Sequence, residues 1–147
     1  MKESPMKTSA RNQLVGTVKS IKHGAVNDEI IVTLSGGQEL AATITCDSRE
    51  YLELKEGKPV VALIKSTSVI IATDAAHIKL SARNRLTGTI SNISRGAVYS
   101  LVEIDLGNDV SIIAGITIES SDGLDLHVGQ TATALFKAGS VILGVPA

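Results

Sequence analysis

The residues best suited to chemistry in this sequence form a set of polar donors that occurs twice. Ser-Ala-Arg-Asn stands at positions 9–12 and again, unaltered, at 81–84. Sliding the sequence over itself by 72 positions aligns 9–72 with 81–144 without a gap, and 25 of these 64 pairs are identical. Besides apolar and glycine pairs, the repeat keeps a polar set: Ser9/Ser81, Arg11/Arg83, Asn12/Asn84, Ser48/Ser120, Lys65/Lys137 and Ser68/Ser140. Hydroxyls, a guanidinium and an ammonium without a repeated carboxylate partner are the donor half of an anion site.

A doubly charged tetrahedral anion needs donors that converge from several directions. The segment 9–12 offers backbone N–H groups, a hydroxyl and a guanidinium, and Lys65 with Ser66 stands at the end of a predicted strand. Ser48, at a predicted helix start, adds a hydroxyl and the N–H groups of a first helical turn. A structural alternative fits the same residues: the serines and asparagines cap turns or begin a helix, and the cations are solvated.

The elements that must position these donors are short strands. Alternating or β-branched apolar residues predict strands over 14–22, 26–34, 39–45, 60–65 and 69–73, with turns at 23–25 and 35–37. The run Asp47-Ser48-Arg49-Glu50 has the form of a capping box and predicts a short helix. The predicted fold is therefore all-β: two tandem OB-fold-like five-stranded barrels, each with one short helix between its third and fourth strands.

The repeat also predicts the domain organisation. We expect a first domain over 8–73 and a second over 80–147, after an N-terminal tail of residues 1–7. The connector, 73–79, contains neither proline nor glycine, so the lobes should pack closely. No apolar run reaches the roughly 20 residues that cross a bilayer, and the N-terminus lacks the apolar segment of a secretory signal. The single cysteine, Cys46, fits a reducing cytoplasm and is expected to be a small buried residue.

Composition argues against several other functions. A net charge of −1 and only three aromatic residues (Tyr51, Tyr99 and Phe136) disfavour nucleic-acid binding. The histidines, at 23, 77 and 127, lack metal-ligand spacing and are expected to be exposed. The repeated acidic positions fall in the predicted helices, where solvated charges are expected. We find no catalytic machinery and predict a protein that is not an enzyme.

A family resemblance rests on three motifs present in both copies. Ser-Ala-Arg-Asn-x-Leu-x-Gly-Thr, Gly-Ala-Val and Lys-[Ser/Ala]-x-Ser-Val-Ile resemble the molybdenum-pterin-binding (Mop) domain, and two copies in one short chain resemble the tandem molbindins. The resemblance covers nearly everything from Thr8 to Ala147. It implies a small cytoplasmic protein that binds molybdate, and also tungstate, for molybdenum storage or homeostasis. It further implies a homotrimer of six lobes, with oxyanions bound at the interfaces between lobes.

The resemblance also implies ligand residues. In the first lobe they are Ser9, Ala10 (through its backbone), Arg11, Lys65 and Ser66, with Ser48 contributed by a facing lobe; in the second they are Ser81, Ala82, Arg83, Lys137, Ala138 and Ser120. Ala138 replaces Ser66 and loses a hydroxyl worth about 1 kcal/mol, so the second site should be weaker. The Gly-Ala-Val turns are candidates for additional anion sites on a symmetry axis: Gly24, Ala25, Val26, Gly96, Ala97 and Val98. No residue is expected to ligate a metal cation directly.

Two other functions stay open at this stage. The second hypothesis is that the lobes are a ligand-sensing regulatory module, because Mop domains also occur fused to transcription regulators and transporter ATPases. Neither a helix-turn-helix nor a P-loop precedes Ser9, which favours an isolated binding role. Oligonucleotide binding by the barrels is the third hypothesis, and the charge and aromatic count disfavour it.

Overall fold

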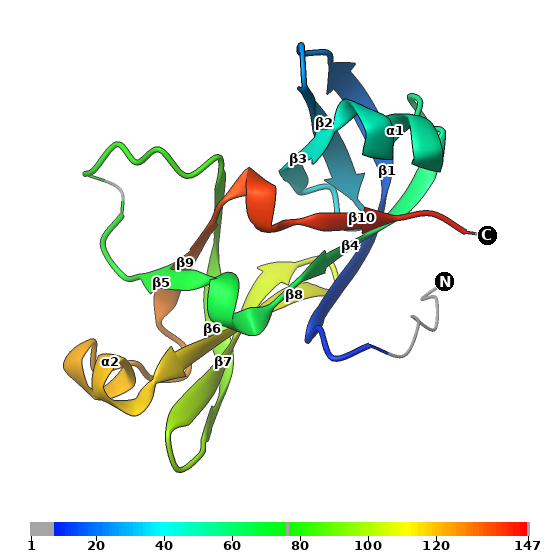
Figure 1. The fold of residues 1–147 in the computed structure, drawn as a ribbon. Helices are drawn as coiled ribbons and strands as arrows, with labels where there is room; N and C mark the ends of the chain where they lie inside the picture. The colour runs from blue at the N-terminus through cyan, green and yellow to red at the C-terminus, as the bar shows by residue number, and fades with distance from the viewer. Residues whose placement is uncertain (1–7, 76, 147) are drawn as a thin grey trace.

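The computed structural model describes residues 8–75 and 77–146, so the expected tail of residues 1–7 lies outside the described part. Ten strands form two five-stranded antiparallel sheets (Figure 1). One sheet has the strand order β10-β4-β1-β2-β3, and the other has the order β5-β9-β6-β7-β8. This confirms the predicted all-β class with two tandem OB-like folds.

Each half of the chain builds its strands from the same alternating pattern. In β2 every second residue is buried, and β7 alternates in the same way as far as Ile104, as expected for strands with one face on a core. The first-half strands are β1 (Asn12–Lys22), β2 (Asn27–Leu34), β3 (Glu39–Thr45), β4 (Pro59–Ile64) and β5 (Ile70–Ala72). Their counterparts are β6 (Asn84–Arg95), β7 (Tyr99–Gly107), β8 (Val110–Thr117), β9 (Thr131–Phe136) and β10 (Ile142–Gly144). The predicted ranges differ from these by one or two residues at the ends.

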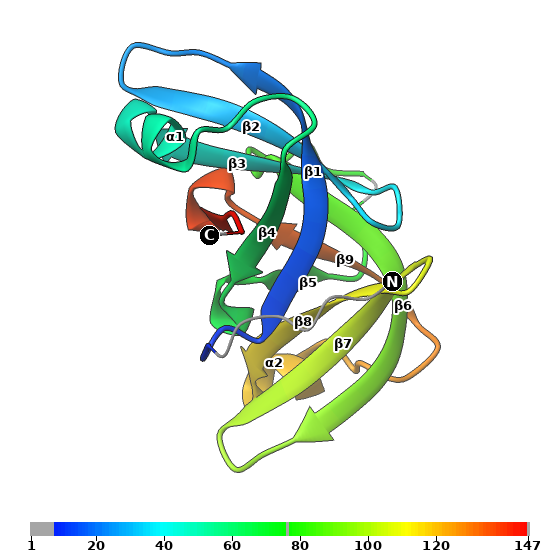
Figure 2. The same ribbon diagram turned by 90° about the vertical axis from the view of Figure 1, so that its right-hand side faces the viewer.

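Four short helical segments complete the fold. The α-helices are α1 (Cys46–Leu52) and α2 (Ile118–Gly123), and they lie at opposite ends of the molecule (Figures 1 and 2). The 3-10 turns η1 (Ser66–Ser68) and η2 (Ala138–Ser140) follow β4 and β9. No described helix is long and apolar enough to span a membrane.

The fifth strands are exchanged between the lobes, which the sequence analysis did not anticipate. β5 pairs with β9 of the second half, and β10 crosses back to pair with β4 of the first half (Figure 1). The physical cause lies in the two 3-10 turns. η1 packs against β8 and η2 packs against β3, so each turn carries the chain onto the opposite lobe before its last strand begins. The sheets therefore do not coincide with residues 8–73 and 80–147.

The two lobes share one core. The largest cluster of buried side chains runs without a break from Val18, Ile30 and Val32 in the first sheet to Ile90, Ile104 and Phe136 in the second. Close approach of strands is possible at Gly88, where an added Cβ would lie 2.1 Å from the carbonyl oxygen of Asp105. The position therefore requires glycine.

Candidate functional site

The last residue of each Ser-Ala-Arg-Asn motif fixes the motif at the boundary between the lobes. Asn12 is 2% exposed, and its side-chain Nδ2 donates to the carbonyl oxygen of Ile113 in β8 at 2.8 Å. The backbone N–H of Ile113 donates in return to Asn12 Oδ1 at 2.7 Å. The amide side chain thus pairs with the opposite lobe as a residue of a neighbouring strand would.

The second motif makes the reciprocal contact. Asn84, also 2% exposed, donates from Nδ2 to the carbonyl oxygen of Ala41 at 2.8 Å and accepts from the N–H of Ala41 at 2.7 Å. Positions 41 and 113 are themselves repeat equivalents, so the two asparagines mark a pseudo-two-fold relation between the lobes. The suggestion that Asn12 caps a turn is therefore wrong, because both asparagines clamp the opposite lobe.

Strand register brings the two cations of each lobe to the same strand ends. In the β1–β4 pair Asn12 lies opposite Ile64, so Arg11 and Lys65 come next at one end of the ladder. The predicted donors at this end of the ladder are called the first donor group: Ser9, Ala10, Arg11, Lys65 and Ser66. In the β6–β9 pair Asn84 lies opposite Phe136, so Arg83 and Lys137 come next in the same way, and the predicted donors there are called the second donor group: Ser81, Ala82, Arg83, Lys137 and Ala138.

The arginine and lysine side chains of both donor groups are exposed, as an accessible anion site requires. The Ala10 N–H, an expected backbone donor, donates to Thr8 Oγ1 at 3.3 Å. That bond is long, so the N–H remains a weakly held donor. Among residues 8–75 and 77–146, no cluster of three histidine, cysteine or acidic side chains could hold a metal ion.

The 3-10 turn of each donor group packs against one strand of the other half of the chain: η1 contacts β8, and η2 contacts β3. The side chains at these two contacts differ. Ser66 Oγ lies 3.0 Å from the point where a Cβ on Gly115 of β8 would stand. At the equivalent contact of η2 with β3, the serine is replaced by Ala138 and the glycine by Thr43. Each contact therefore pairs one small residue with one hydroxyl, but the hydroxyl belongs to the 3-10 turn on one side (Ser66) and to the strand on the other (Thr43).

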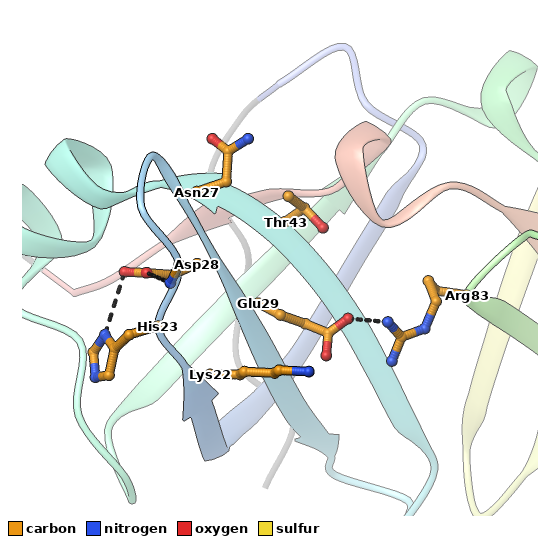
Figure 3. Close-up of a pocket in the computed structure, with 8 residues that line it drawn as sticks. Lys22, His23, Asn27, Asp28, Glu29, Thr43 and Arg83 are labelled. Atoms are coloured by element: carbon orange, nitrogen blue, oxygen red, sulfur yellow. Dashed lines mark hydrogen bonds and ion pairs between the residues drawn. The ribbon is translucent and has the colours of Figure 1, made fainter.

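The second donor group also meets a carboxylate. Arg83 Nη1 forms an ion pair with Glu29 Oε2 of β2 across the lobe boundary (Figure 3). The pair borders a hollow of about 240 Å³, which is also lined by Lys22, His23 and Thr43. Among the described residues no ion pair involves Arg11, the repeat equivalent of Arg83.

The two helix serines, Ser48 and Ser120, lie in the first turns of α1 and α2 but do not begin them. The N-cap is Thr45, whose Oγ1 accepts from the Ser48 N–H at 3.0 Å and donates to Ser48 Oγ at 2.9 Å. Thr117 caps α2 in the same way. The capping box predicted at Asp47 is therefore wrong, and the Ser48 N–H is not available to an anion. Because Ser48 Oγ accepts from Thr45, its own proton remains available to an outside acceptor.

No hydrogen bond links either helix serine to a donor group within the described residues. The threonine caps were missed although Thr45 and Thr117 are an identical pair of the repeat. Threonine three residues before the serine, at the last position of a strand, was the available signal.

The Gly-Ala-Val turns are exposed, but their glycine N–H groups already have acceptors. Gly24 donates to Asp28 Oδ1 at 3.0 Å, and Gly96 donates to the carbonyl oxygen of Tyr99 at 2.8 Å. Any anion at these turns would have to use the alanine and valine N–H groups.

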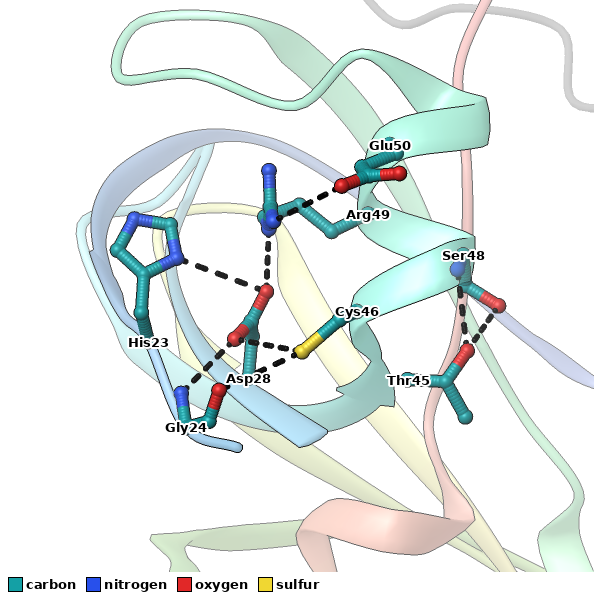
Figure 4. A network of polar contacts seen from close by, with 8 residues as sticks. All are labelled: His23, Gly24, Asp28, Thr45, Cys46, Ser48, Arg49 and Glu50. Carbon is teal, nitrogen blue, oxygen red and sulfur yellow. Dashed lines mark hydrogen bonds and ion pairs between the residues drawn. The ribbon is translucent and has the colours of Figure 1, made fainter. Parts of the chain in front are cut away.

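Asp28 is the centre of a buried network beside α1 (Figure 4). The Gly24 N–H is the main cause that lowers the pKa of Asp28 to about 2, and Arg49 and the Cys46 thiol add to it although burial acts in the opposite direction. Burial, together with the nearby carboxylate, raises the pKa of Cys46. Cys46 is half-buried, and its thiol donates to Asp28 Oδ1 at 3.3 Å, so it is more than an apolar filler. His23 is exposed at the edge of this network, as predicted.

Comparisons with known proteins agree with the repeat. The TOBE domain family matches residues 8–71 and again residues 80–143. The chain is 45% identical over 145 residues to the molybdenum transport protein ModE of Herbaspirillum seropedicae, covering 99% of this chain and 54% of that protein. It is 45% identical over 141 residues to the molybdenum-pterin-binding protein MopA of Rhodobacter capsulatus, covering 96% of this chain and 53% of that protein. The chain thus spans about half the length of these curated relatives.

A solved structure is similar over its whole length. The cytoplasmic molybdate-binding protein ModG, crystallised with molybdate bound, superposes with a TM-score of 0.92 at 46% identity, covering 96% of this chain and 100% of that chain. The resemblance to Mop proteins drawn from the repeated motifs is confirmed by these relatives. The chain belongs to the TOBE-domain family and carries two copies of the domain in tandem.

Proposed function

We propose that this protein binds molybdate reversibly at the two donor groups between its lobes and serves molybdenum storage or homeostasis in the cytoplasm. The observation that carries the proposal is the reciprocal clamp of Asn12 and Asn84. It holds an arginine next to a lysine at each lobe boundary. Similarity along the full length of a cytoplasmic protein crystallised with molybdate supports the same ligand here.

The chemistry of each donor group suits a tetrahedral dianion. One arginine and one lysine balance two negative charges, and a contact at 4 Å contributes roughly 4 kcal/mol of Coulomb energy at a surface-like dielectric before desolvation is subtracted. Serine hydroxyls and backbone N–H groups supply directional hydrogen bonds. Tungstate has the same charge and shape, so we propose that it binds at the same positions. Binding, with no covalent step, is the proposed activity.

We propose that the complete sites form in a trimer of six lobes. Apolar side chains that repeat at equivalent positions are left exposed: Val26 (70%), Val98 (64%), Ile70 (63%) and Ile142 (63%). Association of copies would cover them. In such an assembly Ser48 and Ser120 of neighbouring lobes would complete the donor groups, and the Gly-Ala-Val turns would meet on a symmetry axis as additional anion positions. Light scattering tests the trimer.

Calorimetric titration with sodium molybdate tests the main proposal, with tungstate and sulfate as comparison anions. We expect saturable heat for molybdate and tungstate, and bound molybdenum after dialysis by elemental analysis. Arg11→Ala and Lys65→Ala should each remove binding at the first donor group with the circular dichroism spectrum unchanged. Lys55→Ala, which removes an exposed cation outside both donor groups, is the matched control. No heat and no retained metal in the wild-type protein would reject the proposal.

A regulatory role is the second candidate. It is favoured by relatives such as the transcriptional regulator ModE of Yersinia pestis, 36% identical over 139 residues, of which this chain covers 52%. The discriminating experiment is a gel shift with DNA fragments in the presence and absence of molybdate. A molybdate-dependent shift would favour regulation over storage.

A further inference from the structure

The two lobe boundaries differ in one row of side chains across the sheets. In the first sheet Lys22, Glu29 and Thr43 lie directly opposite one another on β1, β2 and β3. Directly paired residues of neighbouring strands project from the same face. All three border the hollow that contains Arg83 (Figure 3).

The equivalent row of the second sheet is Ser94, Leu101 and Gly115 on β6, β7 and β8. It carries no charge. The two-fold relation marked by the asparagine clamps turns this row toward the first donor group, and Ser66 Oγ accordingly lies against Gly115. A carboxylate therefore faces the second donor group, and a leucine stands at the same place opposite the first.

Glu29 is well placed to act on Arg83. Its side chain is only 21% exposed, whereas that of Arg83 is 57% exposed, so the carboxylate forms the wall of the hollow and the guanidinium reaches toward it. The carboxylate oxygen thus occupies Nη1, one of the guanidinium donors that a tetrahedral oxyanion could use. An oxyanion that binds Arg83 through Nη1 must displace Glu29 and then lie near its negative charge.

We propose that Glu29 is an internal competitor for the oxyanion at the second donor group, and that it makes the two sites of the chain unequal. The inference rests on the proposed function. The first donor group, which faces Leu101, loads at lower ligand concentration, and the second loads only when the ligand displaces the carboxylate. Lys22, the direct cross-strand neighbour of Glu29, offers the displaced carboxylate another partner.

Titration of the full-length protein with sodium molybdate, comparing wild type with Glu29→Gln, tests the inference. Glutamine keeps the size of the side chain and removes its charge. We expect two affinity classes in the wild type, and a rise of about five- to tenfold in the affinity of the weaker class in the variant. That range corresponds to losing one partly exposed ion pair and its repulsion of the ligand. Glu39→Gln is the matched control, because Glu39 pairs with Lys19 at an exposed position.

Two further variants test the assignment to a particular site. In an Arg83→Ala background, Glu29→Gln should have no further effect on the affinity of the remaining class. Conversely, Leu101→Glu should weaken the tighter class, whereas Leu101→Gln should change it much less. The Leu101 variants are compared only where their circular dichroism spectra match that of the wild type. The comparison of Glu29→Gln in the wild-type and Arg83→Ala backgrounds tests the inference without them.

The outcomes separate the inference from the proposed function. A wild type that binds molybdate with an affinity unchanged by Glu29→Gln would overturn the inference and leave the proposed function standing. An effect of Glu29→Gln that persists at full size without Arg83 would overturn it as well. Absence of any binding to the wild type would overturn both.

Discussion

Replacing Asn84 by aspartate would test the inter-lobe clamp at a single atom. Asn84→Asp keeps the shape of the side chain but puts an oxygen where Nδ2 now donates to the carbonyl of Ala41 at 2.8 Å. An ionised carboxylate there would face that carbonyl in a buried position. Only the protonated acid can restore both hydrogen bonds, because its O–H donates and its other oxygen accepts from the Ala41 N–H.

The magnitude follows from the cost of keeping the introduced carboxyl protonated. Its pKa in the unfolded chain is about 4, and each pH unit above that value costs about 1.4 kcal/mol. The folded protein has the higher pKa, so the loss of stability is small at pH 4 and grows as the pH rises. It should reach about 4 kcal/mol at pH 7, a large share of the 5–15 kcal/mol that holds a typical domain.

Urea unfolding at several pH values between 4 and 7 measures this difference, with wild type and variant compared at each pH. Asn92→Asp is the matched control, since Asn92 is an exposed residue of the same strand β6. The control should lose less than about 0.5 kcal/mol at every pH. If Asn84→Asp were as stable as the control at pH 7, the clamp would not hold the lobes as described.

Three further predictions concern stability. The pKa of Asp28 is lowered to about 2, so its carboxylate adds stability that is present above about pH 4 and lost as the pH falls toward 2. The urea midpoint of unfolding should therefore fall less steeply with pH in Asp28→Ser than in the wild type. An equal dependence on pH would contradict the buried network. Gly88→Ala should cost about 2 kcal/mol or more, because its Cβ would lie 2.1 Å from a backbone carbonyl oxygen; an unchanged melting temperature would refute this. Gly115→Thr should destabilise the protein by about 1–3 kcal/mol, and adding Ser66→Ala should recover part of the loss; simple additivity in the double-mutant cycle would show that the two positions are independent.

The sequence predicted the strands and the donor groups because both depend on local patterns. Alternating burial in β2 and β7 is visible as alternating hydropathy, and the pairing of Arg11 with Lys65 follows once β1 and β4 are taken as neighbours. The role of Asn12 and Asn84 was not predictable in this way. Their partners lie 101 and 43 residues away, and the contacts are to backbone atoms, which leave no trace in side-chain patterns.

The exchange of the fifth strands was hidden by the repeat itself. β5 places Ile70 opposite Leu135, whereas pairing within its own half would place it opposite the equivalent residue, Leu63. β10 makes the converse choice with Ile142 and Leu63. The two pairings bring together residues of the same type, so local chemistry does not distinguish them. The path of η1 and η2 across the lobe boundary determines which strand β5 and β10 pair with.

The sequence predicted a weaker second site from the replacement of Ser66 by Ala138, but it did not predict the difference in charge between the two sites. The donors are identical pairs of the repeat, whereas the environment of each donor group is set by positions that differ, Glu29 against Leu101 and Thr43 against Gly115. Comparing the unequal pairs of an internal repeat, once register is known, shows where two similar sites diverge.

Because each half of the chain completes the sheet of the other, neither half is a self-sufficient folding unit. Opening the backbone in the loop after β5 would leave two fragments still interlocked through β5 and β10, and they should migrate together until a denaturant separates them. The same topology suits an ancestor of half the length, in which two identical molecules clasped one another through their last strands. Fusion of two such copies would have made that clasp intramolecular and raised the effective concentration of each partner.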